Sequence, residues 1–373
     1  MIDVSCNCSA VISNSTNTSP KLPPEYLSVI KKVCYFIIAI LALFGNTLVS
    51  LFFCQKRKTL LKKSYYIILL ALAITDIVTA FFLFITPAFL FIDSFPEPTN
   101  RTALWIYCKV LWGRLLLFIF GVASVYLILL LTIDRWYAVM KPTKYKTYIT
   151  KTKVIRGIVL SYFLGALFII PSHPNIKIIP ENPSGQRCSF DRTPHLQVTV
   201  TINFFTKALF PFIAIAVMYS NILYKMKSSS LFQQHMKEPR KHITKIAFGA
   251  SLTILICWLP NQINLLLYAY GMSSVETSFH DFTVGLVFMT SCINPILYGL
   301  TSKKFRKGYW ETLKSFKRMF QPFFKLSTSL RTQIEPALGS DVVREPGERH
   351  RAVECSLTRV CKIQSDEQID AKT

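Results

Sequence analysis

The last long apolar segment of the chain contains the stretch Ser291-Cys292-Ile293-Asn294-Pro295-Ile296-Leu297-Tyr298. Proline lacks a backbone N–H, so Pro295 leaves a carbonyl oxygen of the preceding turn without its usual donor. Inside a membrane a neighbouring polar group must satisfy that oxygen, and Asn294 is the predicted donor. Tyr298 follows Asn294 by one helical turn, so both side chains are expected to face the interior of a helix bundle.

A short polar break at residues 301–304 leads into a different pattern. Apolar side chains recur every three or four residues with Lys and Arg between them, at Phe305, Tyr309, Leu313, Phe316 and Phe320. This spacing predicts an amphipathic helix lying on a membrane surface over residues 301–320. Residues 321–373 lose the apolar pattern and are predicted to form a disordered cytoplasmic tail.

The composition indicates a membrane protein, because 51% of the residues are hydrophobic and only 17% are charged. A helix needs roughly 20 apolar residues to cross about 30 Å of hydrocarbon. Stretches of this kind occupy residues 33–54, 65–92, 104–131, 154–171, 199–224, 243–270 and 281–300. The predicted fold class is therefore an all-α membrane protein, with a seven-helix transmembrane bundle over residues 33–300 and an eighth, amphipathic helix after it.

The chain has a formal net charge of +23, and its Lys and Arg residues flank the predicted spans on one side. Lys and Arg follow the first span, lie between the third and fourth and between the fifth and sixth, and follow the seventh. The positive-inside rule makes this side cytoplasmic, which leaves residues 1–32 as an extracellular tail of a multi-pass plasma-membrane protein. Nucleic-acid binding is excluded as a function, because it would need the cations on one folded basic face.

Glycosylation sequons test this orientation independently. The Asn-x-Ser/Thr pattern occurs at Asn7, Asn14, Asn17 and Asn100, and all four lie on the predicted outer side. The sequence therefore predicts a glycoprotein whose amino terminus is extracellular.

The Asn-Pro-x-x-Tyr pattern at Asn294, Pro295 and Tyr298, followed by a basic amphipathic helix, resembles the end of the seventh helix of rhodopsin-like G-protein-coupled receptors. Further motifs of that family stand in order along the chain: Gly45-Asn46, Asp76, Asp134-Arg135, Pro211 with Tyr219, and Cys257-Trp258-Leu259-Pro260. The resemblance covers roughly residues 33–318. It implies a receptor, not an enzyme, that binds an extracellular ligand and activates a heterotrimeric G protein.

Asp76 lies within hydrocarbon, where a carboxylate is costly, so it should face an interior cavity with polar partners. By resemblance its partners are Asn46, Ser124 and Asn294, in a cluster that in the family often holds a sodium ion. No other cofactor or metal is expected. The alternative is an aspartate hydrogen-bonded for packing alone.

The resemblance also implies an inner switch, formed by Asp134, Arg135, Tyr219, Asn294, Pro295 and Tyr298. Arg135 would rest against Asp134 until it meets the G protein; the alternative is an arginine that only snorkels at the interface. Three positions depart from the family pattern: Trp136 replaces tyrosine, Tyr162 replaces tryptophan and Ile254 replaces phenylalanine. Arg240 stands where an acidic partner for Arg135 is expected on the sixth helix, which predicts raised basal activity.

Cys108 and Cys188 both lie on the oxidising side and are expected to pair. By resemblance they form the family's disulfide between the third helix and the following outer loop. Cys108 lies farther from Arg135 than the family spacing, and a bulge or an extra part-turn would absorb the difference. The remaining membrane cysteines, Cys34, Cys54, Cys257 and Cys292, are predicted to be small buried hydrophobic residues.

A ligand pocket is predicted from Arg114, Leu117, Lys207, Trp258, Asn261 and Gln262. Cations inside a membrane are functional candidates, so Arg114 and Lys207 are expected to meet an acidic ligand group. The alternative is that Arg114 snorkels outward and Lys207 lines a wet vestibule. Trp258, beside the kink at Pro260, would form the pocket floor; the alternative is a tryptophan that only fills the core.

Two residues narrow the class of ligand that the resemblance implies. Leu117 stands where amine receptors carry aspartate, so a monoamine is not expected, and Phe288 stands where a retinal-binding lysine would lie. The motifs around Asn261, Gln262 and Asn294 are similar to those of neuropeptide receptors, which favours a peptide ligand, with a lipid or small carboxylate second.

Other classes of membrane protein fit less well. A transporter or channel would show repeats or a chain of ionisable residues through the spans. A membrane enzyme would need clustered His or acidic residues, and the six His are scattered. An arrestin is a further expected partner, through phosphorylation of Ser327, Thr328, Ser329 and Thr332 in the tail.

Overall fold

A computed structural model describes residues 24–86, 98–171, 176–178, 188–190, 195–228, 238–275, 277–315, 317–318 and 321. The chain divides into two compact units, residues 1–310 and 311–373. The bundle described below belongs to the first unit. The predictions that fall outside the described residues concern the sequons at Asn7, Asn14 and Asn17, the apolar positions Phe316 and Phe320, and the tail phosphorylation sites.

Seven helices of the described chain are long and apolar enough to cross a membrane, which confirms the predicted fold class. The long elements are α1 (Pro24–Gln55), α3 (Ser64–Ile85), α5 (Leu115–Met140), α7 (Lys151–Ile169), α9 (Phe210–Ser228), α11 (Glu238–Ala269) and α12 (Ser278–Thr301). Shorter helices are α2 (Arg57–Leu60), α4 (Arg101–Ile106), α6 (Tyr145–Tyr148) and α8 (His195–Phe204). π-helical segments, Tyr107–Trp112 and Phe205–Leu209, extend the third and fifth spans outward to α4 and α8.

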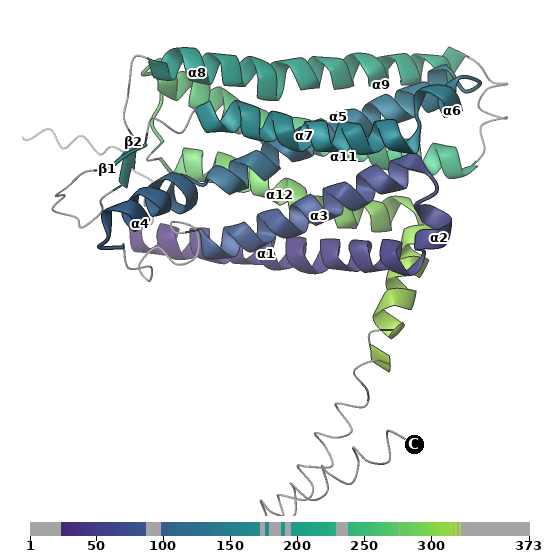
Figure 1. Cartoon of the computed structure of the whole chain (residues 1–373), viewed down its shortest axis with the longest axis horizontal. Helices are drawn as coiled ribbons and strands as arrows, with labels where there is room; N and C mark the ends of the chain where they lie inside the picture. The colour runs from purple at the N-terminus through teal and green to yellow at the C-terminus, as the bar shows by residue number, and fades with distance from the viewer. Residues whose placement is uncertain are drawn as a thin grey trace, which may run out of the picture. The chain divides into compact units, whose positions relative to one another are not determined.

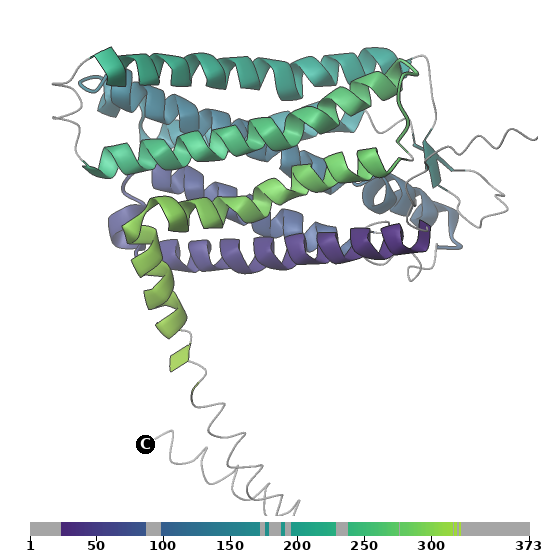
Figure 2. The same ribbon diagram turned by 180° about the vertical axis from the view of Figure 1, so that it is seen from behind.

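The long helices lie alongside one another, with short elements at the two ends (Figure 1). Strands β1 (Ile176–Ile178) and β2 (Cys188–Phe190) form an antiparallel pair at the same end as α4, the predicted extracellular end. Helices α2 and α6 mark the opposite, cytoplasmic end. Figure 2 shows α12, in yellow-green, between α1 and α11, and α12 packs against both.

The outer surface of the bundle is apolar, as a lipid-facing surface must be. Phe44, Val159, Phe210 and Phe282 are each more than half exposed. The interior holds polar and charged side chains of the spans, including Asp76, Asn294 and Arg135.

The cysteine prediction is right for Cys257 and Cys292, which are buried, and wrong for Cys34 and Cys54, which are exposed. The error has a simple cause. The lipid-facing surface of a bundle is as apolar as its core, so an apolar neighbourhood in the sequence does not distinguish the two.

The predicted irregularity between Cys108 and Arg135 is confirmed. The segment Tyr107–Trp112 is π-helical, and it ends at Gly113 and Arg114, after which α5 begins. Arg114 has a left-handed backbone, with φ of 58°. A Cβ atom at Gly113 would lie 2.3 Å from the Ile176 side chain and 2.9 Å from the carbonyl oxygen of Lys109, so this close approach favours glycine.

A further helix begins at Lys303 and continues to residue 315, after Ser302 breaks α12 with an extended backbone. The eighth helix is therefore present. Phe305, which the pattern assigned to a membrane surface, is instead buried within the bundle. Its ring lies 5.5 Å from that of Phe52, 5.8 Å from that of Phe53 and 5.4 Å from that of Tyr298. This aromatic cluster fixes the start of the helix against α1 and α12.

Close helix packing at Gly165 makes a first testable prediction. A Cβ atom at this position of α7 would lie 2.5 Å from the carbonyl oxygen of Ile119 on α5, and a backbone atom cannot rotate away. We expect Gly165→Ala to lower the unfolding free energy by about 1–3 kcal/mol through overpacking. Gly249→Ala is the matched control, because its Cβ atom would lie 3.5 Å from a flexible Leu297 side chain. Thermal unfolding in detergent micelles measures both, and equal melting temperatures would contradict the expectation.

Candidate ligand site and cytoplasmic switch

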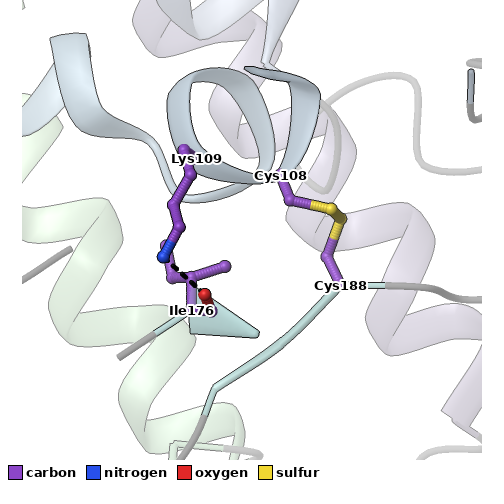
Figure 3. Close-up of a disulfide and its surroundings, with 4 residues drawn as sticks. All are labelled: Cys108, Lys109, Ile176 and Cys188. Carbon is purple, nitrogen blue, oxygen red and sulfur yellow. Dashed lines mark hydrogen bonds between the residues drawn. A yellow bond between two sulfur atoms is a disulfide. The ribbon is translucent and has the colours of Figure 1, made fainter. Parts of the chain in front are cut away.

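The outer end of the bundle is closed by a disulfide between Cys108 and Cys188 (Figure 3), which confirms the predicted pair. It joins the π-helical start of the third span to β2. The ammonium group of Lys109 donates a hydrogen bond to the carbonyl oxygen of Ile176 on β1, at 2.5 Å. The two contacts hold both strands of the pair against the same turn of helix, so the hairpin has a fixed position over the third span.

Arg114 points into the bundle rather than outward. Its Nε atom is buried, and its charge lies within range of Tyr35 on α1 and Asp281 on α12. Arg114 therefore does not snorkel outward. It already has electrostatic partners within the protein.

Lys207 lies in the π-helical segment before α9 and is only 6% exposed. In the described parts of the chain, no carboxylate forms an ion pair with it. A buried ammonium group without a counter-ion is costly, so this position favours binding of an anion.

Trp258 is 2% exposed and lies against the third span. A Cβ atom at Gly121 would be 3.2 Å from its indole ring. Leu117 stands one helical turn above Gly121 and packs with Val284 and Phe288 of α12. The indole therefore lies one turn below Leu117.

The two amides that follow Pro260 in α11 differ in their surroundings. Asn261 is buried and donates a hydrogen bond to the Thr283 hydroxyl on α12, at 3.2 Å. Gln262 is 8% exposed. Asn261 therefore ties α11 to α12.

In the middle of the bundle, the carbonyl oxygen freed by Pro295 belongs to Ser291, and its donor is not the predicted one. The Asn46 amide donates to this oxygen at 2.8 Å and to the Ala42 carbonyl at 2.9 Å. Asn294 instead donates to the Asp76 carboxylate at 2.9 Å. The prediction failed because it considered only the helix that contains the proline, whereas an amide on α1 lies closer to the open carbonyl.

Asp76 is 1% exposed and also interacts with the Ser291 hydroxyl. Ser124 is buried on α5, and no described hydrogen bond joins it to Asp76. The Oδ1 atom of Asn46 is a buried acceptor without a hydrogen-bond partner among the described residues. Carboxylate and amide oxygens are the ligands that hard cations prefer, so the residues present fit a sodium ion.

At the cytoplasmic end, Asp134 and Arg135 form a buried ion pair. Arg135 donates to the Asp134 carboxylate through Nε at 2.8 Å and through Nη2. Tyr145 of α6 donates to the other carboxylate oxygen at 2.8 Å, and the guanidinium group lies 4.4 Å above the ring of Tyr65. Burial, together with the Asp134 charge, raises the pKa of Tyr145, so its hydroxyl remains a donor.

Two other predicted switch residues, Tyr219 and Tyr298, are buried on α9 and α12. Tyr219 is buried on α9, with its ring 5.1 Å from that of Phe248 on α11. Tyr298 is fully buried, and its hydroxyl has no hydrogen-bond partner in the described chain. A buried hydroxyl without a partner costs about 1–3 kcal/mol, which favours any arrangement that supplies one.

Comparison with known proteins identifies the family. The family model described as "7 transmembrane receptor (rhodopsin family)" matches residues 45–298. The chain belongs to the rhodopsin family of seven-transmembrane receptors. Similar curated proteins include the type-1 angiotensin II receptors of Ovis aries and Bos taurus, each 28% identical over 335 residues, with 83% of this chain and 87% of the relative covered. The type-1 angiotensin II receptor of Sus scrofa is 26% identical over 333 residues, with the same coverage.

The receptor is thus a multi-pass protein of the plasma membrane, responds to an extracellular ligand and couples to a G protein. Its family is one of receptors rather than enzymes.

The three residues that depart from the family pattern each contact neighbouring residues in this receptor. The Tyr162 hydroxyl lies 2.7 Å from that of Thr75, one residue before Asp76, and so connects α7 to α3. Ile254 is buried in the core, one turn from Trp258. The ammonium group of Lys141 lies 5.7 Å from the Trp136 ring.

Sequence reasoning missed a polar group at the outer end of the receptor. Asn264 lies 2.9 Å from His280 and accepts a hydrogen bond from Ser273 at 2.7 Å. Lys31 pairs with Asp281 at 2.8 Å, beside a groove of about 620 Å³ between α1 and α12. Ionisable residues near the ends of the first and last spans were the available signal.

Proposed function

We infer that the receptor binds an extracellular peptide through an acidic group that meets Lys207, and transmits this binding to a heterotrimeric G protein. The observation that carries the ligand assignment is the burial of Lys207 without an ion pair in the described chain. The similar type-1 receptors are named for angiotensin II, which is a peptide. Leu117, above the indole of Trp258, offers no carboxylate to a cationic ligand, which argues against a monoamine.

The proposed mechanism is a shift between two arrangements of the bundle. A ligand that binds one arrangement more tightly shifts the population by its difference in affinity. Lys207 and Trp258 would sense the ligand, and Pro260 and Pro295 would serve as pivots within α11 and α12. At the cytoplasmic end, Arg135 would leave Asp134 to contact the G protein. The hydroxyl of Tyr298 would gain a hydrogen-bond partner, and Tyr219 would move with it.

A second candidate ligand is a lipid or small carboxylate. The groove between α1 and α12 is lined by apolar side chains such as Phe282 and Leu286, with the Lys31–Asp281 pair at one edge. Phe282 is 62% exposed on the bundle surface, so an amphipathic ligand would reach this groove from the bilayer.

The test is a screen of peptide and lipid pools on cells that express the receptor with a promiscuous G protein, with calcium as the readout. Arg135→Ala serves as the control, because it removes the proposed G-protein contact and leaves the outer end unchanged. A peptide response that disappears in this variant supports the proposal. A response to lipid pools alone would select the second candidate, and silence at confirmed surface expression would contradict both.

Sodium binding at Asp76 makes a separate prediction. An ion held by Asp76 and Asn46 would stabilise one arrangement of the bundle, so agonist affinity should change when sodium chloride is exchanged for choline chloride. In Asp76→Asn this dependence should vanish, because the carboxylate charge is removed while the side-chain size is kept. Radioligand competition in the two salts measures the effect, and sodium dependence that survives in the variant would refute the site.

The surroundings of Arg135 also favour raised basal activity. Its described partners, Asp134, Tyr145 and Tyr65, lie on α5, α6 and α3 rather than on α11. The side chain of Arg240 is outside the part that the structure describes. If α11 supplies no partner, that helix is held less firmly in the resting arrangement. We expect signalling without ligand to rise with receptor expression above mock-transfected cells; output equal to mock at every expression level would disprove this.

Two further proposals concern modification. Asn100, with Asn7, Asn14 and Asn17, is proposed to carry glycans. The Oδ1 atom of Asn100 caps α4 by accepting from Thr102 and Ala103, which uses the oxygen and leaves the amide nitrogen for the glycan. Phosphorylation of the tail is proposed to recruit an arrestin.

A further inference from the structure

A cavity of about 670 Å³ opens at the cytoplasmic end, between the start of α3, the end of α5 and the start of α7. This volume lies within the range of about 300–1,000 Å³ that is typical of small-molecule sites. The residues that line it come from two loops and the helix ends beside them, and include no acidic side chain; the cations among them are Lys62, Lys63, Arg135, Lys146 and Lys151.

Four of these cations have no counter-charge in the described structure. Lys62, Lys63, Lys146 and Lys151 are exposed, and neither described ion pair involves them. Arg135, at the inner end, is already paired with Asp134. The lysines stand on two walls, one before α3 and one at α6 and α7, so a single anion between the walls would contact both groups.

Two long helices also begin at this cavity. Ser64 starts α3, and its cap residue Lys63 supplies no side-chain hydrogen bond to the first turn. Lys151 starts α7, where the Thr150 hydroxyl accepts a hydrogen bond from the backbone N–H of Lys153. Helix N-termini carry a partial positive charge and free N–H groups, which adds to the attraction of the lysines for an anion. Close by, burial and the charge of Lys63 lower the pKa of Lys304, as expected in a region of excess positive charge.

An exposed apolar face of α7 continues from this cavity. Ile155, Val159 and Phe163 follow Lys151 at intervals of four residues, on one helix face. They are 45%, 63% and 59% exposed, as side chains that face the bilayer are. A ligand whose anionic group fills the cavity would therefore have a continuous apolar surface for acyl chains.

We propose that this cavity binds the headgroup of a phosphoinositide of the inner leaflet, with its phosphates between Lys62 and Lys63 on one wall and Lys146 and Lys151 on the other, and with its acyl chains along α7. Each phosphomonoester carries about 1.5 to 2 negative charges, so two phosphates match four lysines, whereas phosphatidylserine brings a single net charge. Basic pockets on the cytoplasmic side of membrane proteins suit such headgroups.

The test uses the full-length receptor in nanodiscs of phosphatidylcholine that contain either phosphatidylinositol bisphosphate or phosphatidylserine at equal total charge. Native mass spectrometry counts the bound lipid across a titration. The variants are Lys146→Gln/Lys151→Gln and Lys62→Gln/Lys63→Gln, one for each wall. The matched control is Lys227→Gln/Lys245→Gln, which removes two exposed cytoplasmic lysines outside the cavity. A melting temperature for each lipid-free variant checks its folding.

We expect each wall variant to bind phosphatidylinositol bisphosphate about 30-fold more weakly than the wild type. Each surface lysine removed should lower the affinity about fivefold, and each variant removes two. The control should bind as the wild type does, and Lys146→Arg/Lys151→Arg should retain binding. Equal loss in the control, or equal binding of phosphatidylserine, would overturn the site. Binding of soluble inositol trisphosphate without retention of the lipid would overturn the lipid as its ligand.

Discussion

A receptor with serine in place of both Cys108 and Cys188 is expected to lose about 2–5 kcal/mol of unfolding free energy, and with it most of its surface expression. The disulfide closes a loop between residues 80 apart and joins β2 to the third span. Without it, β1 would keep the Lys109–Ile176 hydrogen bond and its packing on Tyr107, but β2 would lose its covalent link to that helix. Thermal unfolding of purified receptor and surface labelling of intact cells measure the two effects.

The two single variants should each match the double variant, because all three remove the same bond. Cys34→Ser is the matched control, since Cys34 is an exposed free cysteine and its loss should leave the melting temperature unchanged. A double variant that is clearly less stable than either single variant would show that the cysteines contribute separately, against the bond seen here.

Charge reversal at Lys207 is expected to abolish the agonist response while surface expression stays intact. Loss of one partner from a buried charge pair costs about 2–5 kcal/mol, so agonist affinity should fall by about 30-fold or more. Repulsion between the introduced carboxylate and an acidic ligand adds to this loss, so Lys207→Glu should be more severe than Lys207→Met. Agonist dose–response curves and competition binding measure both variants.

Lys177→Glu is the matched control for this experiment. Lys177 lies on β1 at the same end of the receptor but is exposed, so its reversal changes the local field without touching a buried site. An equal loss in this variant would assign the effect to long-range attraction. An unchanged dose response in Lys207→Glu would remove Lys207 from the pocket.

The seven-helix fold could be predicted from the sequence, because the length of each apolar span and the charges beside it are local features of the chain. Each span needs only enough apolar residues to cross the bilayer, and lysines on one side set its direction. An irregularity between Cys108 and Arg135 was also predictable from their spacing, but its position at Tyr107–Trp112 was not. Its π-helical form and left-handed backbone were not predictable either, because they depend on contact between Gly113 and Ile176 on a distant strand.

The sequence did not predict which side chains of different spans contact each other. Asn46 and Asn294 were both assigned to the polar cluster, but which amide satisfies the Ser291 carbonyl depends on how closely α1 approaches α12. At Gly45 that approach is close, since a Cβ atom there would lie 2.9 Å from the Pro295 ring.

Neither the burial of Phe305 nor the basic cavity at the cytoplasmic end could be predicted from the sequence. Phe305 looked like a lipid-facing residue, and only the positions of Phe52 and Phe53 show that it is buried. The basic cavity forms because the loop before α3 lies beside the loop between α5 and α7. The two loops are far apart in the sequence, so this contact could not be predicted from it.

The hydrogen bond from Asn46 to the Ser291 carbonyl means that the region of α12 around Pro295 is not held by α12 alone. Within one helical turn, α1 holds a carbonyl through Asn46, and α3 holds the Asn294 side chain through Asp76. The inner half of α12 therefore cannot rotate gradually past its neighbours, since a small rotation would strain both bonds without replacing either. Its movement should be all-or-none, with intermediate positions sparsely populated.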